Sequence, residues 1–365
     1  MGRLLLLLTV LVLLICPVFA VTEDSVLDTT DFGASSLPNG LTEDQRQLMG
    51  DADPLKKTDL WSSLQSMLSS ALRGSGSFLR QTTGQASVVL AICLLCSLCG
   101  GGEEGAERAA VMAGVVAITA VCVSPVDGMI RLASDTVQEV TAFSQLFLPV
   151  LASASAAAGA LTSAPAVCGF AVLLSDVLLS LMNSILIPGI LIFLALSAVD
   201  AALGVSSLRR FCGLTAWAVK SGMKVLLYGF TGFLTVTQVV SGSADAMTAK
   251  AAKLTISGVV PVVGSILSDA SETLLVSASL IRNSIGVYGL LAVLAVCILP
   301  FIRIGIWYLC LKITAAVAGV TSKDPLVRMV DAVSEGMGML LGMTGTAALM
   351  TMITVVCSLK LAGGA

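Results

Sequence analysis

Long apolar stretches separated by short polar segments make up most of the chain from residue 86 onward. A run of about 20 apolar residues has the length of a membrane-crossing helix, and in lipid only helices and closed barrels satisfy their backbone polar groups. Eight ranges are predicted as membrane helices: 86–100, 109–126, 146–163, 166–183, 185–204, 222–241, 285–302 and 337–358. A further range, 304–320, is apolar but contains Lys312. The pattern predicts an all-α, polytopic helical membrane protein with about 7–9 membrane helices.

The composition supports a membrane protein and excludes several kinds of site. Hydrophobic residues make up 56% of the chain and charged residues 12%, against about 25% charged in soluble domains. The chain has no histidine, which excludes Ser-His-Asp hydrolases, HExxH metalloproteases and sites that bind zinc or haem through imidazole. The formal net charge of −3 argues against nucleic-acid binding, which needs clustered Lys and Arg. We expect no enzyme activity, no cofactor and no metal.

The first 20 residues have the pattern of a signal peptide. Arg3 precedes the apolar core Leu4–Ile15, and the residues up to Ala20 offer a cleavage site. An uncleaved signal anchor is the alternative. Residues 21–85 are predicted to form an acidic extracytoplasmic region that is partly disordered, because its first half is rich in Asp, Ser, Pro and Gly.

An amphipathic helix is predicted within this region, over 58–73. Its apolar residues recur at helical spacing: Leu60, Leu64, Met67, Leu68, Ala71 and Leu72. Trp61 lies beside that stripe. The helix fits two interpretations, one in which it lies on the outer face of the membrane and one in which it binds a partner protein.

The rest of the chain divides into three predicted parts, which are a membrane hairpin over 86–126, an amphipathic connector over 127–145 and a polytopic membrane domain over 146–360. The segment 206–224, taken as a loop, has four basic residues and no acid: Arg209, Arg210, Lys220 and Lys224. Because cytoplasmic segments of membrane proteins carry an excess of Lys and Arg, we place this segment inside. The topology of 304–336 stays open.

Two polar-containing segments in the apolar part of the chain resemble each other. Pro165–Ile185 and Pro261–Gly286 both begin with Pro and then Gly, pass through Leu-Ser-Asp and reach Asn-Ser-Ile. By the predicted spans an odd number of crossings separates the two starts, which would make them an inverted internal repeat, as in many secondary transporters. The alternative is a chance likeness between two segments built from Leu, Ser, Ala and Val.

The polar residues of these two segments are the candidate site. A charge at the centre of the bilayer costs roughly 2.5–3.5 kcal/mol, so intramembrane charges are expected to line a polar cavity or to lie at the membrane surface. The candidate cavity or coupling residues are Asp176, Asn183, Asp269, Glu272, Arg282 and Asn283. Neither aspartate has the Tyr-Asp or Gly-x-Gly-Asp setting of an intramembrane protease. Asp200, at the end of a predicted span, is either an ion ligand or a helix-end group that reaches to the membrane surface.

Four stretches between Leu148 and the C-terminus are similar to a known family: LPVLASASAAAGALTSAP (148–165), VVSGSADAMT (239–248), the segment that begins PVVGSILSDASETLLVSASLIRNSIG (261–286), and the Pro300 region. These stretches give the chain a resemblance to the stage III sporulation protein AE family. It implies a non-enzymatic integral-membrane subunit of the channel complex that links mother cell and forespore, in the outer forespore membrane. The implied partners are the other stage III A operon membrane proteins, among them an ATPase and ring-forming subunits, and the forespore-side stage II sporulation protein Q. The alternative function is a secondary transporter that uses the intramembrane Asp residues.

Overall fold

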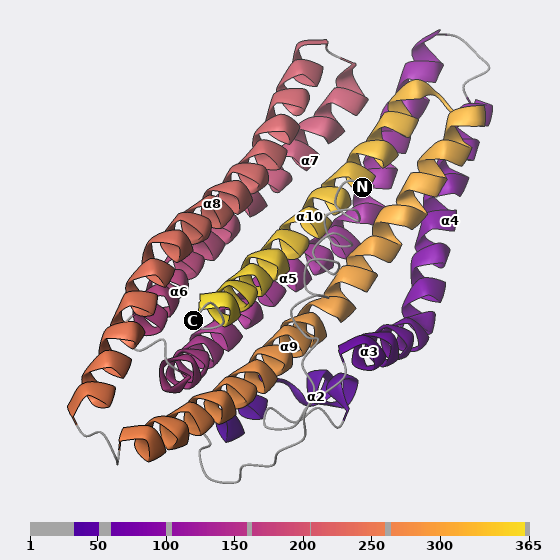
Figure 1. The fold of residues 1–365 in the computed structure, drawn as a ribbon. Coiled ribbons are helices and arrows are strands. Elements are labelled where there is room, and N and C mark those ends of the chain that lie inside the picture. Colours follow the sequence, from indigo (N-terminus) through magenta and orange to yellow (C-terminus); the bar gives the residue numbers. More distant parts are fainter. Residues whose placement is uncertain are drawn as a thin grey trace.

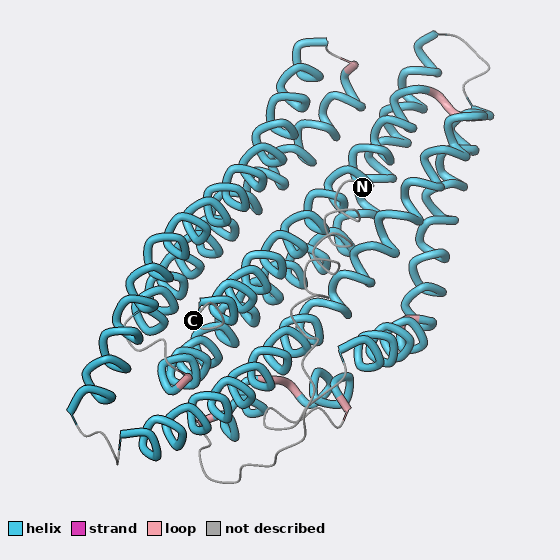
Figure 2. The backbone as a smooth tube through the Cα atoms, in the orientation of Figure 1, coloured by secondary structure: helices cyan, strands magenta, loops and turns pink. Residues whose placement is uncertain are grey.

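The computed structural model describes residues 33–50, 60–99, 104–158, 163–204, 206–259 and 264–361, and the predicted signal peptide lies outside these ranges. The described residues form helices joined by short turns, with no strand among them (Figure 2). The α-helices are α2 (Glu43–Met49), α3 (Leu60–Gly74), α4 (Gly76–Cys99), α5 (Glu104–Ala157), α6 (Ser163–Leu181), α7 (Ile187–Leu203), α8 (Ser206–Val259), α9 (Gly264–Thr321) and α10 (Asp324–Leu361). Two further elements are the 3₁₀ helix η2 (Ala34–Gly40) and the π-helical segment η3 (Met182–Leu186).

The structure confirms an all-α, polytopic architecture. Five stretches in the described part of the chain are long and apolar enough to cross a membrane: Gly76–Cys99, Gly105–Ala157, Gly169–Leu203, Ala278–Thr321 and Asp324–Leu359. Segment η3 joins α6 to α7, so the two predicted spans 166–183 and 185–204 form one continuous rod. The basic segment predicted as a loop over 206–224 is instead the first part of α8.

Several helices are far longer than one membrane crossing. Helices α5 and α8 have 54 residues each and α9 has 58. At 1.5 Å per residue each is about 80 Å long, against about 30 Å for the hydrocarbon core of a bilayer. Helix α5 runs unbroken through Pro125 and Pro149, so the second span of the predicted hairpin and the predicted connector share one helix. The open range 304–336 contains the end of α9, a turn at 322–323 and the start of α10.

The rods run alternately up and down between two ends of the bundle (Figure 1). At one end, here called the basic end, the α9–α10 turn meets the start of α5 through Lys323 Nζ and Glu107 Oε1, 2.7 Å apart. The end of α4 lies there as well, because the Ser97 hydroxyl donates to the carbonyl of Thr321 at 2.6 Å. The opposite end, here called the cap end, contains η2, α2 and α3 (Figure 1).

The direction of the rods corrects the predicted inverted repeat. The rod α6–η3–α7 and helix α9 both begin near the cap end and finish at the basic end (Figure 1). The two resembling segments at the starts of α6 and α9 therefore run the same way along the bundle. The predicted count of crossings was wrong because it divided one continuous rod, α6–η3–α7, into two spans at Asn183 and Ser184.

Helices α9 and α10 form the centre of the bundle. In the most apolar window of each, 72% of the residues are buried, against 22% in α4 and 28% in α5 and in the α6–α7 rod. At several glycines of α9 and α10, a large side chain from a neighbouring helix occupies the space that a Cβ would fill. A Cβ on Gly289 would lie 2.1 Å from the ring of Phe147 on α5, and a Cβ on Gly286 would lie 2.5 Å from Leu359 on α10. Helices α5 and α10 therefore approach α9 closely at these positions.

Residues 33–50, here called the N-terminal cap, pack onto the cap end of the bundle. Leu37 is buried in one apolar cluster with Phe143 and Phe147 of α5 and Tyr288 of α9. The Gln45 side chain accepts a hydrogen bond from the Thr42 backbone at 2.9 Å and donates one to Glu139 Oε2 of α5 at 2.7 Å. This part of the predicted acidic region therefore has a defined fold.

Substituting Gly289 tests the close approach of α5 to α9. We expect Gly289→Ala to lower the free energy of unfolding by about 1–3 kcal/mol, because the new methyl group overlaps the Phe147 ring. The matched control is Gly229→Ala on α8, where nothing lies within 4 Å of the added Cβ. Thermal unfolding of the purified chain in detergent measures both variants. Equal melting temperatures for the two variants would contradict the expected overlap, and Phe147→Leu should partly rescue Gly289→Ala.

Candidate functional site: a charged cleft between α7, α8 and α10

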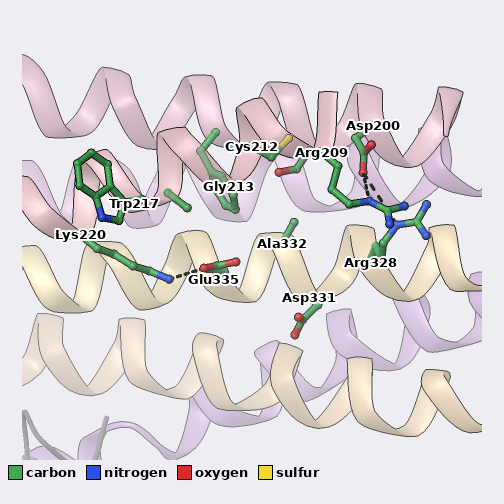
Figure 3. Close-up of a pocket in the computed structure, with 13 residues that line it drawn as sticks. Asp200, Arg209, Cys212, Gly213, Trp217, Lys220, Arg328, Asp331, Ala332 and Glu335 are labelled. Atoms are coloured by element: carbon green, nitrogen blue, oxygen red, sulfur yellow. Dashed lines mark hydrogen bonds and ion pairs between the residues drawn. The ribbon is translucent and has the colours of Figure 1, made fainter. Parts of the chain in front are cut away.

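A cleft of about 490 Å³ opens between α7, α8 and α10 near the basic end (Figure 3). Its charged lining consists of three acids and three bases: Asp200, Asp331, Glu335, Arg209, Lys220 and Arg328. Its apolar lining includes Phe193, Cys212 and Trp217. The site therefore has balanced charge.

Asp200 is the most deeply buried charged group of the cleft, with 6% of the residue exposed. It lies in the last turn of α7, and the helix ends where the Gly204 N–H donates to the Asp200 carbonyl at 2.8 Å. Gly204 has a φ of 68°, a left-handed conformation that suits glycine and turns the chain directly into α8. This short turn brings Arg209 of α8 back beside the Asp200 carboxylate.

Two arginines from different helices neutralise Asp200. Arg209 Nε lies 3.9 Å from Asp200 Oδ2, and Arg328 Nε of α10 lies 4.0 Å from the same oxygen (Figure 3). These distances are ion pairs rather than hydrogen bonds. Asp200 Oδ1 and Arg328 Nε are buried and have no hydrogen-bond partner. The carboxylate is therefore held by charge, and one of its oxygens can still accept a hydrogen bond.

The charges of α10 form one stripe along the cleft. Arg328, Asp331 and Glu335 are spaced by three and four residues, which places them on one face of the helix. Glu335 pairs with Lys220 of α8, and Asp331 pairs with Lys312 of α9. These pairs are partly exposed, so each contributes little stability alone, but together they link α10 to both neighbouring helices.

The predicted site residues on the first segment lie on α6 and η3. Asp176 is exposed on α6, 3.4 Å from the Gln145 amide of α5. Asn183 lies in η3, where an extra residue widens the helical turn, and its buried side-chain oxygen has no hydrogen-bond partner. Helix α6 packs mainly against α5, α8 and α10.

The predicted residues on the second segment lie on α9. Arg282 is 4% exposed, and its Nη2 donates to Asn283 Oδ1 at 3.4 Å. Arg282 Nε and Nη1 are buried without a hydrogen-bond partner. The side chains of Asp269 and Glu272 lie outside the described residues, and so does the cavity predicted to join Asp176 to Asp269. The four predicted site residues that the structure describes, Asp176, Asn183, Arg282 and Asn283, thus lie on the α6–η3 rod and on α9. These elements pack chiefly against other helices rather than against each other.

The Asp200 cluster was not predicted as a site. The signal was present, because Arg328, Asp331 and Glu335 follow helical spacing at the start of an apolar helix. What the sequence does not show is that Arg209 and Asp200, on two antiparallel helices, face this stripe. Among the described residues no group of three or more His, Cys, Asp or Glu side chains could hold a metal ion. The arrangement can fix three helices together and offers a polar, charge-balanced surface near the basic end.

The fold and this cleft define a polytopic helical membrane protein whose charged groups join helices. The sequence model of the stage III sporulation protein AE family matches residues 57–362, so the chain belongs to that family and is a sporulation membrane protein. It is 23% identical over 206 residues to the stage III sporulation protein AE of Bacillus subtilis (strain 168). That match covers 56% of this chain and 52% of the relative, so the chain spans about half the length of the curated relative. No solved structure matches the chain.

Removing the charge of Asp200 tests the ion-paired cluster. We expect Asp200→Asn to lower the free energy of unfolding by about 1–2 kcal/mol, because Arg209 and Arg328 then lie close together without a counter-charge. The matched control is Asp127→Asn, which removes an exposed pair with Arg131 within one helix and should cost less than about 0.5 kcal/mol. Denaturant titration of both variants in detergent measures the difference. Equal losses would show that Asp200 does not join the three helices.

Replacing Arg282 tests whether the buried guanidinium serves stability or function. We expect Arg282→Met to melt at the same or a higher temperature, because it removes a buried charge that lacks full hydrogen bonding and leaves an unbranched apolar side chain in its place. Spore yield in an endospore-forming host measures the functional effect. A stable variant with reduced spore yield would assign Arg282 a functional role, whereas a clear loss of stability would show that Arg282 is needed for packing.

Proposed function

We propose that the protein is a non-enzymatic, multi-pass subunit of the sporulation transenvelope channel complex that links mother cell and forespore, and that it resides in the mother-cell (outer forespore) membrane. Its partners are the other stage III A operon membrane proteins, including an ATPase and ring-forming subunits, and the stage II sporulation protein Q of the forespore. The family to which the chain belongs supports the process. The distribution of Lys and Arg along the bundle supports an orientation in which the basic end faces the mother-cell cytoplasm.

The number of Lys and Arg residues at or near one end of the bundle is the observation that carries this proposal. Basic residues from three parts of the chain lie at or near the basic end: Arg209, Arg210, Lys220, Lys323 and Arg328. Lys and Arg accumulate on the cytoplasmic side of membrane proteins, so the basic end faces the mother-cell cytoplasm. The N-terminal cap, at the opposite end, then faces the space between the two membranes. This orientation gives the subunit one surface for each compartment.

The ion-paired cleft fits a passive, structural role for this subunit. Its pairs join helices and leave little charge uncompensated, which suits a membrane platform that is held rigid while a partner ATPase supplies energy. The alternative, a secondary transporter built on an inverted repeat, loses its main argument because the two resembling segments run in the same direction. The intramembrane Asp residues alone do not distinguish the two functions.

Co-purification and reconstitution together test the proposal. A tagged chain, crosslinked in sporulating cells, should bring down the operon ATPase and ring-forming proteins, and an unrelated tagged polytopic protein of the same membrane should not. The purified chain alone in liposomes should move no solute when a proton or sodium gradient is applied. Gradient-driven uptake that is lost on Asp176→Asn, but kept on Asp127→Asn, would overturn the proposal in favour of a transporter.

A further inference from the structure

Helix α3 has three distinct faces. Met67 and Ala71 are each 1% exposed, and Met67 packs with Leu64 in the apolar cluster at the cap end. A second face is apolar but open: Trp61 is 73%, Leu68 49% and Leu72 55% exposed. The remaining exposed face is polar and includes Ser66, Ser70 and Arg73. Because these positions follow helical spacing, the open apolar face lies about a quarter-turn from the packed face.

A tight corner at Ser75 sets the direction of α3 relative to α4. Only Ser75 separates the two helices, and its hydroxyl donates to the Ala71 carbonyl at 2.7 Å. The Leu79 N–H donates to the Ser75 carbonyl at 2.9 Å, so α4 begins directly at the corner. Helix α3 lies crosswise to α4 and to the long rods (Figure 1). When α4 crosses a membrane, α3 therefore lies near the plane of its surface.

The open face of α3 continues into a surface that is itself exposed and apolar. Helix α4 has 24 residues, about 36 Å, which matches one crossing of the bilayer. It exposes Leu79 just after the corner, and Val88, Leu95 and Leu98 further along. A helix with a large exposed apolar side chain such as Trp61 and a separate polar face is typical of helices embedded in the membrane interface.

We propose that α3 is an interfacial anchor whose Trp61, Leu68 and Leu72 face inserts into the acyl chains of the bilayer at the level where α4 enters. The occupant of this face is lipid, rather than a partner protein or a second copy of the chain. The packed face, with Met67 and Ala71, fixes the anchor rigidly to α9, and the serine face meets water. The anchor sets the depth of the bundle in the membrane independently of any partner in a complex.

Fluorescence quenching of Trp61 in liposomes tests this anchor. The full-length chain with Trp217→Phe is compared with the same chain carrying Trp61→Phe as well, so that the difference between them is the emission of Trp61. Both substituted side chains are largely exposed, and the substitutions should leave the fold intact. In phosphatidylcholine liposomes with brominated acyl chains, we expect loss of the Trp61 emission, and we expect acrylamide in the aqueous phase to leave that emission nearly unchanged.

A tryptophan moved to the polar face is the matched control. The variant Trp61→Phe/Ser70→Trp/Trp217→Phe places it on the opposite side of the same helix, where acrylamide should quench it and brominated lipid should not. Quenching of Trp61 by acrylamide alone would show an open, water-exposed face and overturn the anchor. Protection of Trp61 from both quenchers would mean that protein covers the face, and would overturn it equally. These readouts need no complex partner, so they stand or fall separately from the proposed channel role.

Discussion

The close packing of large side chains into glycine positions on α9 and α10 is the constraint on which the rest of the bundle depends. Lipid is as apolar as the helices, so helices in a membrane associate through close contact rather than through the hydrophobic effect. Leu194 of α7 lies beside Gly336, and Met223 of α8 lies beside Gly342. The same close packing continues toward the cap end, beyond the lipid, where Phe147 of α5 fills the space beside Gly289. Helices α9 and α10 thereby fix the positions of α5, α7 and α8 along the bundle axis relative to one another.

This fixed register also decides where charged groups can meet. With Leu194 and Met223 held against α10, the end of α7 and the start of α8 lie beside the first three turns of α10. Asp200 then faces Arg328, and Lys220 faces Glu335, although these residues are far apart in the sequence. The ion pairs are a consequence of the apolar register and strengthen it only modestly, because the Lys220–Glu335 pair is partly exposed and the two arginines lie 3.9 and 4.0 Å from Asp200, beyond hydrogen-bond distance.

Apolar pattern and composition were enough to predict the class of fold, because the requirement for helices in lipid applies to every stretch separately. They did not predict the length of the rods. The predicted membrane hairpin ended at residue 126, but Asp127 and Arg131 pair with each other at 2.9 Å on an exposed face of α5, where charge does not interrupt a helix. The sequence showed that the segments Pro165–Ile185 and Pro261–Gly286 resemble each other. Whether the two segments run in the same direction along the bundle depends on how many rods lie between them, which the sequence pattern did not show. Helical spacing shows the charged stripe of Arg328, Asp331 and Glu335 on α10, but the contacts of Asp200 and Arg209 with that stripe depend on how the helices pack, which the sequence pattern does not show.

The length of the rods explains why the N-terminal cap is folded. Helices of about 80 Å cannot lie within a hydrocarbon core of about 30 Å, so part of the bundle stands outside the bilayer. With α3 in the membrane surface, as proposed above, and α4 crossing from it to the basic end, this part lies on the cap side. Its core would expose Phe143 and Phe147 to water unless other apolar side chains covered them. Leu37, Leu41 and Met49 of the cap join the same buried cluster, so a segment that composition alone marks as acidic and polar completes the core where lipid no longer covers it.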